Sequence, residues 1–129
     1  MKRRERLSGR RRFAAVRAGR ASAGTAALRV HVAANGLPHA RLGFAVPKSA
    51  GGAVERNTIR RRLRAALEPH RPELAGLDVV VSASAAVLAM RFADLATELW
   101  RCIGAARSRM AENGRTRPGP LRALSPTPA

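Results

Sequence analysis

An unbroken basic stretch from residue 56 to residue 67, reading Arg-Asn-Thr-Ile-Arg-Arg-Arg-Leu-Arg-Ala-Ala-Leu, limits the possible folds of this chain more than any other feature. At helical spacing, Ile59, Leu63 and Leu67 fall at i, i+4 and i+8 and form one apolar stripe. Gly51-Gly52 allows a tight turn into this segment, and Pro69 stands at its end. The stretch therefore predicts an amphipathic helix that buries one stripe and leaves the rest to solvent.

The remaining faces of this helix are strongly basic. Arg56, Arg60 and Arg64 form one row at i, i+4 spacing, and Asn57 and Arg61 form a second row beside it. Like charges at this spacing repel by about 0.2–0.5 kcal/mol per pair, and the segment contains no acid that would offset them. The pattern favours a polyanion as the partner. The alternative is a solvated charged face in a chain whose composition is simply rich in arginine.

Alternating and apolar runs on both sides of the helix predict strands and further helices. Residues 25–34 and 41–46 alternate between apolar and polar positions, and residues 77–83 contain an apolar run suited to a buried strand. Residues 92–110 have apolar positions at helical spacing, and a short helix is expected around residues 8–19. The order is helix, strands, helix, strand, helix, which predicts an α/β two-layer sandwich on one mixed sheet.

Length and composition indicate one domain. The 129 residues are 46% apolar but only 3% aromatic, so the core is expected to consist mostly of Ala, Val and Leu. We expect a single α/β domain over residues 1–112 with a mobile basic N-terminus over about residues 1–8. Residues 113–129 are rich in Pro, Gly and Arg and are expected to be disordered.

The net charge of +17 predicts binding to a polyanion, with nucleic acid first and an anionic membrane surface second. Cys102 is the only cysteine, so an internal disulfide is excluded and a reduced, cytoplasmic location is expected. The basic N-terminus lacks the apolar run of a signal peptide, and no stretch approaches transmembrane length.

No group of residues in the sequence has the pattern of a catalytic site. The eight acids form no convincing short-range pair, and His31, His39 and His70 lie on different predicted elements without metal-ligand spacing. Metal-assisted hydrolysis needs clustered carboxylates, and we predict no catalytic residues; metal sites on the protein stay undetermined. The sequence therefore predicts RNA binding that supports chemistry carried out elsewhere.

The basic helix also carries a family resemblance. Arg56-Asn57, Arg60-Arg61 and Arg64 resemble the Arg-Asn-x-x-(Lys/Arg)-Arg-x-x-Arg signature of the bacterial ribonuclease P protein component. The lead-in segments 43–48 and 51–54 have the family's spacing to the helix, and the start resembles the family through Arg6-Leu7, a basic cluster and Phe13. The resemblance covers roughly residues 5–110.

This resemblance implies a fold and a function. The family's sheet has a short extra strand near residues 20–25 and a left-handed strand–helix–strand crossover, against the general rule, like the second domain of a small-subunit ribosomal protein. The protein subunit joins a catalytic RNA, and the complex removes the 5′ leader of precursor tRNA by endonucleolytic cleavage. The RNA and its Mg²⁺ carry out the hydrolysis. The implied partners are thus the catalytic RNA and precursor tRNA, with no membrane and no obligate protein partner.

The resemblance further implies two binding surfaces. The first surface binds the catalytic RNA through Arg56, Asn57, Arg60, Arg61, Arg64 and Lys48. The second is a cleft for the single-stranded leader, with Phe13, Arg17, Arg29 and His31. The chain departs from the family pattern at Arg17, where relatives often carry an aromatic residue, at Pro47 and Ser49 around the lysine, and at Glu55, which could pair with Arg56 or complement the helix N-terminus.

Other interpretations remain open from the sequence. Asn57 could be a helix cap, and Phe13 could pack in the core. A structural RNA-binding protein of ribosomal type would suit the charge equally well. A DNA-binding recognition helix is disfavoured by the surrounding strands, and a membrane-surface helix by the lack of bulky aromatics on the apolar face.

Overall fold

The structure is a computed structural model that describes the backbone of residues 14–16 and 21–116 and their side chains as far as residue 111. Its strands are β1 (Ser22–Gly24), β2 (Leu28–Ala34), β3 (Arg41–Ala45) and β4 (Leu77–Ala83), and its long helices are α2 (Ala53–Leu67) and α3 (Phe92–Thr116). Short 3-10 helices are η2 (Lys48–Ala50), η3 (Glu68–Leu74) and η4 (Ala85–Ala89), and residues 14–16 are also helical. The order of elements confirms the predicted α/β architecture.

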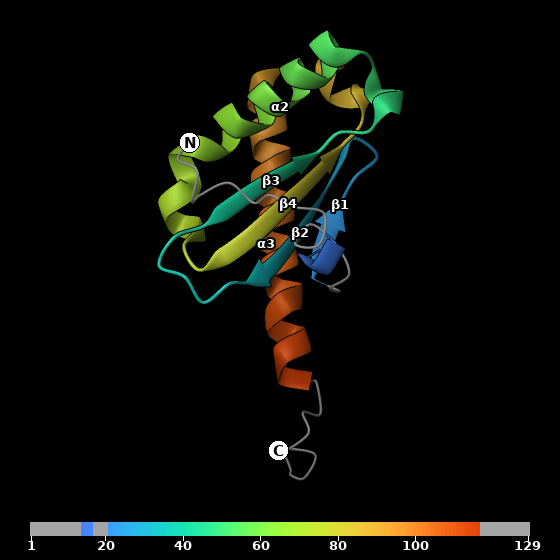
Figure 1. The fold of residues 1–129 in the computed structure, drawn as a ribbon. Helices are drawn as coiled ribbons and strands as arrows, with labels where there is room; N and C mark the ends of the chain where they lie inside the picture. Colours follow the sequence, from blue (N-terminus) through green and yellow to red (C-terminus); the bar gives the residue numbers. More distant parts are fainter. Residues whose placement is uncertain (1–13, 17–20, 117–129) are drawn as a thin grey trace.

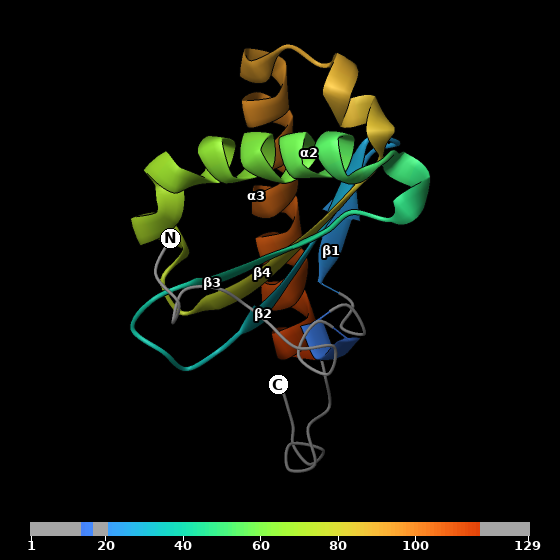
Figure 2. The same ribbon diagram turned by 45° about the horizontal axis from the view of Figure 1, so that its top comes forward.

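The four strands form one mixed sheet in the order β1-β2-β4-β3. β2 pairs antiparallel with both β1 and β4, whereas β3 pairs parallel with β4. α2 connects β3 to β4 and packs on the sheet face that α3 covers, so this crossover is left-handed, as the resemblance implied (Figure 1). Figure 2 shows α2 lying across α3 at one end of the sheet.

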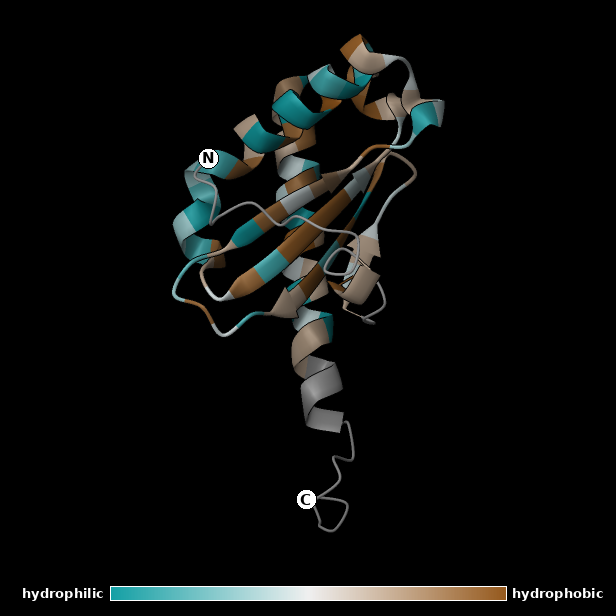
Figure 3. Ribbon diagram, in the orientation of Figure 1, coloured by the Kyte–Doolittle hydropathy of each residue, from teal (hydrophilic) through white to brown (hydrophobic). Residues whose placement is uncertain are grey.

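The core lies between the sheet and the two long helices. Ile59, Leu63 and Leu67 are all buried, which confirms the apolar stripe of the basic helix. β2 turns its apolar residues inward and its polar residues outward, as its alternation predicted. The sheet and α3 complete this core with Leu28, Val30, Val32, Leu42, Val79, Val81, Leu95, Leu99, Cys102 and Ile103. In Figure 3, β4 is coloured largely as hydrophobic and α2 carries hydrophilic segments along its length.

The central strand β4 is covered on both faces. Its outward residue Val80 is fully buried against Val16 and Ala33, so the helical residues 14–16 lie over the outer face of the sheet. A strand buried on both sides reads as a continuous apolar run, and this confirms the interpretation of residues 77–83.

The alternation of apolar and polar residues predicted neither β1 nor the residue at which β2 begins. β2 begins at Leu28 rather than at residue 25, because Thr25 N–H donates to the Leu28 carbonyl (2.7 Å) and closes a turn there. β1 approaches β2 closely at Gly24, where a Cβ atom would lie 2.5 Å from the Leu28 carbonyl oxygen. Glycine is therefore required for this edge pairing.

A proline explains where α2 ends, whereas α3 extends further than the sequence predicted. α2 ends at Leu67 and continues as η3, because Pro69 has no N–H to donate. α3 runs to Thr116, four residues past the expected domain boundary at residue 112. Asn113 and Gly114 weaken a helix without breaking it as proline would. The predicted mobile segment at residues 1–8 and the rest of the predicted tail lie outside the described residues.

In the part of the chain that the structure describes, no helix combines the length and apolar character needed to span a membrane.

Candidate nucleic-acid interface

The entry to α2 is shaped by Gly51 and Glu55. Gly51 has φ +140°, a conformation that residues with a side chain rarely adopt, and the Glu55 carboxylate accepts a hydrogen bond from Gly52 N–H (2.9 Å). Glu55 therefore complements the helix N-terminus, the second of its two expected roles. Arg56 Nε donates to the Gly51 carbonyl (3.2 Å), so this guanidinium lies against the turn that precedes α2.

Asn57 and the two arginines that follow it lie on the solvent side of α2. The helix begins at Ala53 with Gly52 as its N-cap, so the interpretation of Asn57 as a cap is wrong: the residue lies inside the helix. Asn57 and Arg61 are exposed, Arg60 is half-buried, and Arg60 Nη1 donates to Asn57 Oδ1 (3.2 Å). The neutral amide orients the Arg60 guanidinium without neutralising its charge.

Arg64 is less available than its place in the row suggests. It is half-buried, its guanidinium carbon lies 6.0 Å from the centroid of the Phe44 ring, and its Nε has no hydrogen-bond partner among the described residues. A cation over an aromatic face at this distance is weakly attracted to it. Of the predicted RNA-binding residues on α2, Arg60, Arg61 and Asn57 are thus the best placed to meet a partner.

Arg62, which no motif singled out, anchors the fold. Its two terminal nitrogens donate to the carbonyls of Val87 and Met90, so one guanidinium fork joins α2 to η4 and its end. The charge-assisted bonds satisfy carbonyls of a turn that packs against the helix. An arginine run in sequence therefore contains residues of two different roles.

Replacing Arg62 by alanine should lower the free energy of unfolding by about 1–3 kcal/mol, because two carbonyl partners lose their donor. Thermal unfolding of Arg62→Ala beside Arg61→Ala measures this, since Arg61 is the adjacent but exposed arginine. We expect a lower melting temperature for Arg62→Ala alone. Equal melting temperatures for the two variants would show that Arg62 is only a surface charge.

The other predicted site residues lie on the turn before α2 and on the outer face of the sheet. Lys48 is exposed in η2, directly before α2. Arg29 and His31 both point to the outer face; Arg29 is exposed and donates to Ser22 Oγ (3.3 Å), whereas His31 is half-buried. Phe13 and Arg17 lie outside the described residues, on either side of the helical residues 14–16.

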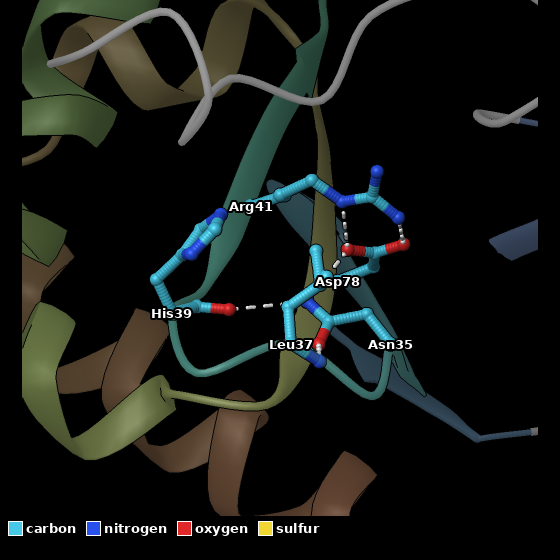
Figure 4. Close-up of polar contacts among 5 residues, drawn as sticks. All are labelled: Asn35, Leu37, His39, Arg41 and Asp78. Atoms are coloured by element: carbon cyan, nitrogen blue, oxygen red, sulfur yellow. Dashed lines mark hydrogen bonds and ion pairs between the residues drawn. The ribbon is translucent and has the colours of Figure 1, made fainter.

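A partly buried ion pair that sequence reasoning missed lies at the start of β4. Arg41 donates from Nε to Asp78 Oδ1 (2.8 Å) and from Nη2 to Asp78 Oδ2 (2.8 Å), and Asn35 Nδ2 donates to Oδ1 (3.0 Å) (Figure 4). This bidentate hydrogen bonding raises the pKa of Arg41. Asn35 also contacts the His39 carbonyl and the Leu37 N–H, so the network fixes the β2–β3 turn. The sequence signal for this ion pair was a single acid, Asp78, near the start of an otherwise apolar run.

Most described acids are engaged away from the basic rows of α2. Asp78 pairs with Arg41, Glu68 with Arg71, Glu73 with His70, and Glu98 with Arg101. Across residues 14–16 and 21–111, no three His, Cys, Asp or Glu side chains are grouped so that they could hold a metal ion. The exposed arginines of α2 consequently keep a positive field that suits phosphates.

Comparisons with known proteins all point to one protein family. The Ribonuclease P family model matches residues 1–107. The ribonuclease P protein component of Streptococcus thermophilus is 41% identical over 63 residues, which are 49% of this chain and 57% of that relative. The aligned segment thus spans little more than half of the curated relative.

Two solved structures are similar over most of the fold. A Staphylococcus aureus RNase P protein mutant with defective mRNA degradation activity gives a TM-score of 0.73 at 26% identity, covering 81% of this chain and 89% of that one. The RNase P protein from Thermotoga maritima gives 0.67 at 25% identity, with coverages of 75% and 93%. With the family model matching most of its length, this chain belongs to the Ribonuclease P family of proteins.

Proposed function

We propose that this chain is the protein subunit of ribonuclease P, which binds the catalytic RNA and supports removal of the 5′ leader from precursor tRNA. The observation that carries the proposal is the solvent-facing side of α2, where Arg60 and Arg61 stand with Asn57 and no described acid is paired with them. Guanidinium groups match phosphate oxygens in geometry and charge. Arg56, Arg64 and Lys48 add positive charge around this centre.

The outer face of the sheet is the proposed surface for the leader. Arg29 and His31 lie on this face, and residues 14–16 pack over it through Val16. Phe13 and Arg17 are the flanking positions from which the family resemblance expects further contacts. Bases of a single strand would stack on rings or guanidinium planes, and Arg29 would meet the backbone.

The chemistry is assigned to the RNA. Phosphodiester hydrolysis with metal assistance needs oxygen ligands brought together, and the described side chains offer no such set. In this proposal the Mg²⁺ of the holoenzyme is held mainly by RNA, as the family resemblance implies, and the protein's residues position RNA strands. A cytoplasmic location and a holoenzyme without another obligate protein belong to the same proposal.

Reconstitution tests this function. The purified protein is added to the ribonuclease P RNA of its own organism at low Mg²⁺, and cleavage of precursor tRNA at the mature 5′ end is measured. We expect strong stimulation over RNA alone and no cleavage by the RNA-free protein. Binding without stimulation would instead indicate a structural RNA-binding protein, and cleavage by protein alone would overturn the assignment of the chemistry.

A further inference from the structure

A hollow of about 890 Å³ opens where the sheet ends beside α2. In Figure 1 this is the end at which the arrowheads of β3 and β4 approach the turn before β2. The lining comes from that turn, from the ends of β3 and β4, and from one residue of α2, Arg60. Two arginines of the two proposed surfaces, Arg29 and Arg60, thus share one hollow.

The walls of the hollow combine apolar surface with a buried hydroxyl. Phe44, Val46 and Pro47 form the apolar side. Ser82 Oγ is buried and has no hydrogen-bond partner within the described part of the chain. A buried hydroxyl without a partner is costly, so the group is set to bind a ligand atom or water.

The charge of the hollow is positive. Arg29 and Arg60 hydrogen-bond only to neutral partners in the described contacts, Ser22 Oγ (3.3 Å) and Asn57 Oδ1 (3.2 Å). No acid belongs to the lining. A ligand with one anionic group and one apolar or planar part fits these walls, and a nucleotide of a single-stranded RNA has both.

The hollow continues the outer face of the sheet. Arg29 of β2 is paired in register with Ser82 of β4, and the next outward pair along the same strands is His31 with Val80. Two residues along a strand are about 7 Å apart. An RNA strand crossing the sheet at His31 therefore reaches the hollow and Arg60 with its neighbouring nucleotides.

We propose that this hollow binds a nucleotide of the precursor tRNA leader, beyond the part that lies over His31. The proposal rests on the function proposed above and extends the leader surface to α2. In it, Arg29 binds the phosphate, Ser82 Oγ donates a hydrogen bond, and the wall at Phe44 contacts the ribose or base. Arg60, which meets the catalytic RNA, adds positive charge at the edge of the hollow next to α2.

The test is a series of precursor tRNAs whose leaders are lengthened one nucleotide at a time. Dissociation constants are measured for holoenzymes containing wild-type protein, Ser82→Leu, or Ala26→Phe. Ser82→Leu fills the hollow with a larger side chain from β4. Ala26→Phe narrows the opening of the hollow, and because Ala26 is exposed, this change leaves the hydrophobic core unaltered. Ser108→Leu, on the exposed side of α3, is the matched control.

We expect wild-type affinity to rise with leader length and then level off. Both filling variants should level off at a shorter leader, with about tenfold weaker binding of long-leader precursors, the usual effect of losing one charged hydrogen-bond contact. Binding of short-leader precursors, of mature tRNA and of the catalytic RNA should equal that of Ser108→Leu.

Three results would overturn the inference. A length series identical to wild type for Ala26→Phe would show that the hollow is not used. Equal losses for all leader lengths would place the effect outside the leader, and weakened assembly with the catalytic RNA would assign the hollow to that RNA instead. Failure of the wild-type holoenzyme to cleave precursor tRNA would count against the proposed function itself, and this result is read before any variant is compared.

Discussion

Replacing Arg60 and Arg61 together by alanine is expected to weaken binding of the catalytic RNA about a hundredfold, because two charge-assisted contacts are lost at about tenfold each. Both residues lie on the solvent side of α2, and neither guanidinium is paired with an acid in the described contacts. If both meet phosphates, the slope of log K against log salt should also fall by about two. Titrations of labelled RNA at several salt concentrations measure both quantities.

The control for this prediction removes the same charge elsewhere. Arg101 and Arg107 are exposed on α3, so Arg101→Ala with Arg107→Ala lowers the net charge by the same amount. We expect a much smaller loss of affinity and a smaller change in slope. Equal losses from the two double variants would mean that overall charge, rather than the face of α2, determines RNA binding.

The second large effect concerns stability. Arg41→Ala should lower the free energy of unfolding by about 2–3 kcal/mol, somewhat less than the 3–5 kcal/mol typical of a broken buried pair, because the Arg41 side chain is 17% exposed and Asp78 keeps its bond to Asn35. For a domain of this size the melting temperature should fall by about 10–20 °C. Thermal unfolding followed by circular dichroism measures this change.

Two further variants separate the pair from a general loss of packing. Arg41→Ala with Asp78→Ala should be less destabilised than the sum of the single changes, since no uncompensated carboxylate remains. Arg101→Ala, which breaks the exposed pair with Glu98 (2.6 Å), should scarcely change the melting temperature. Additive single effects at Arg41 and Asp78 would contradict the role given to the pair.

Much of this fold was predictable because its signals are local. The apolar stripe of α2 and the alternation of β2 depend only on neighbouring positions in the chain, and both are confirmed. β1 was not predictable from periodicity, because three residues carry no pattern and the strand is defined by its pairing with β2. The hand of the crossover likewise came from the family resemblance, since the general rule favours the opposite hand.

The candidate site was predictable by residue type but not by role. Periodicity placed Arg60, Arg62 and Arg64 together in a basic helix, but the partners that distinguish them come from distant segments. Arg62 binds carbonyls of Val87 and Met90, and Arg64 lies over Phe44. Asp78 was overlooked for the same reason, because its partners Arg41 and Asn35 come from another strand and its turn.

The two roles within the arginine run have a consequence for which replacements the helix tolerates. At Arg60 or Arg61 a lysine would keep the positive charge but lose the two-pronged match to a phosphate, so a change to lysine there should weaken RNA binding less than a change to alanine. At Arg62 a lysine should lower the stability of the fold instead, because an ammonium on a single stem cannot span the two carbonyls that the guanidinium fork reaches together. Relatives that exchange arginine for lysine along this helix would thus be expected to do so on its solvent-facing side and to keep an arginine where the helix joins η4.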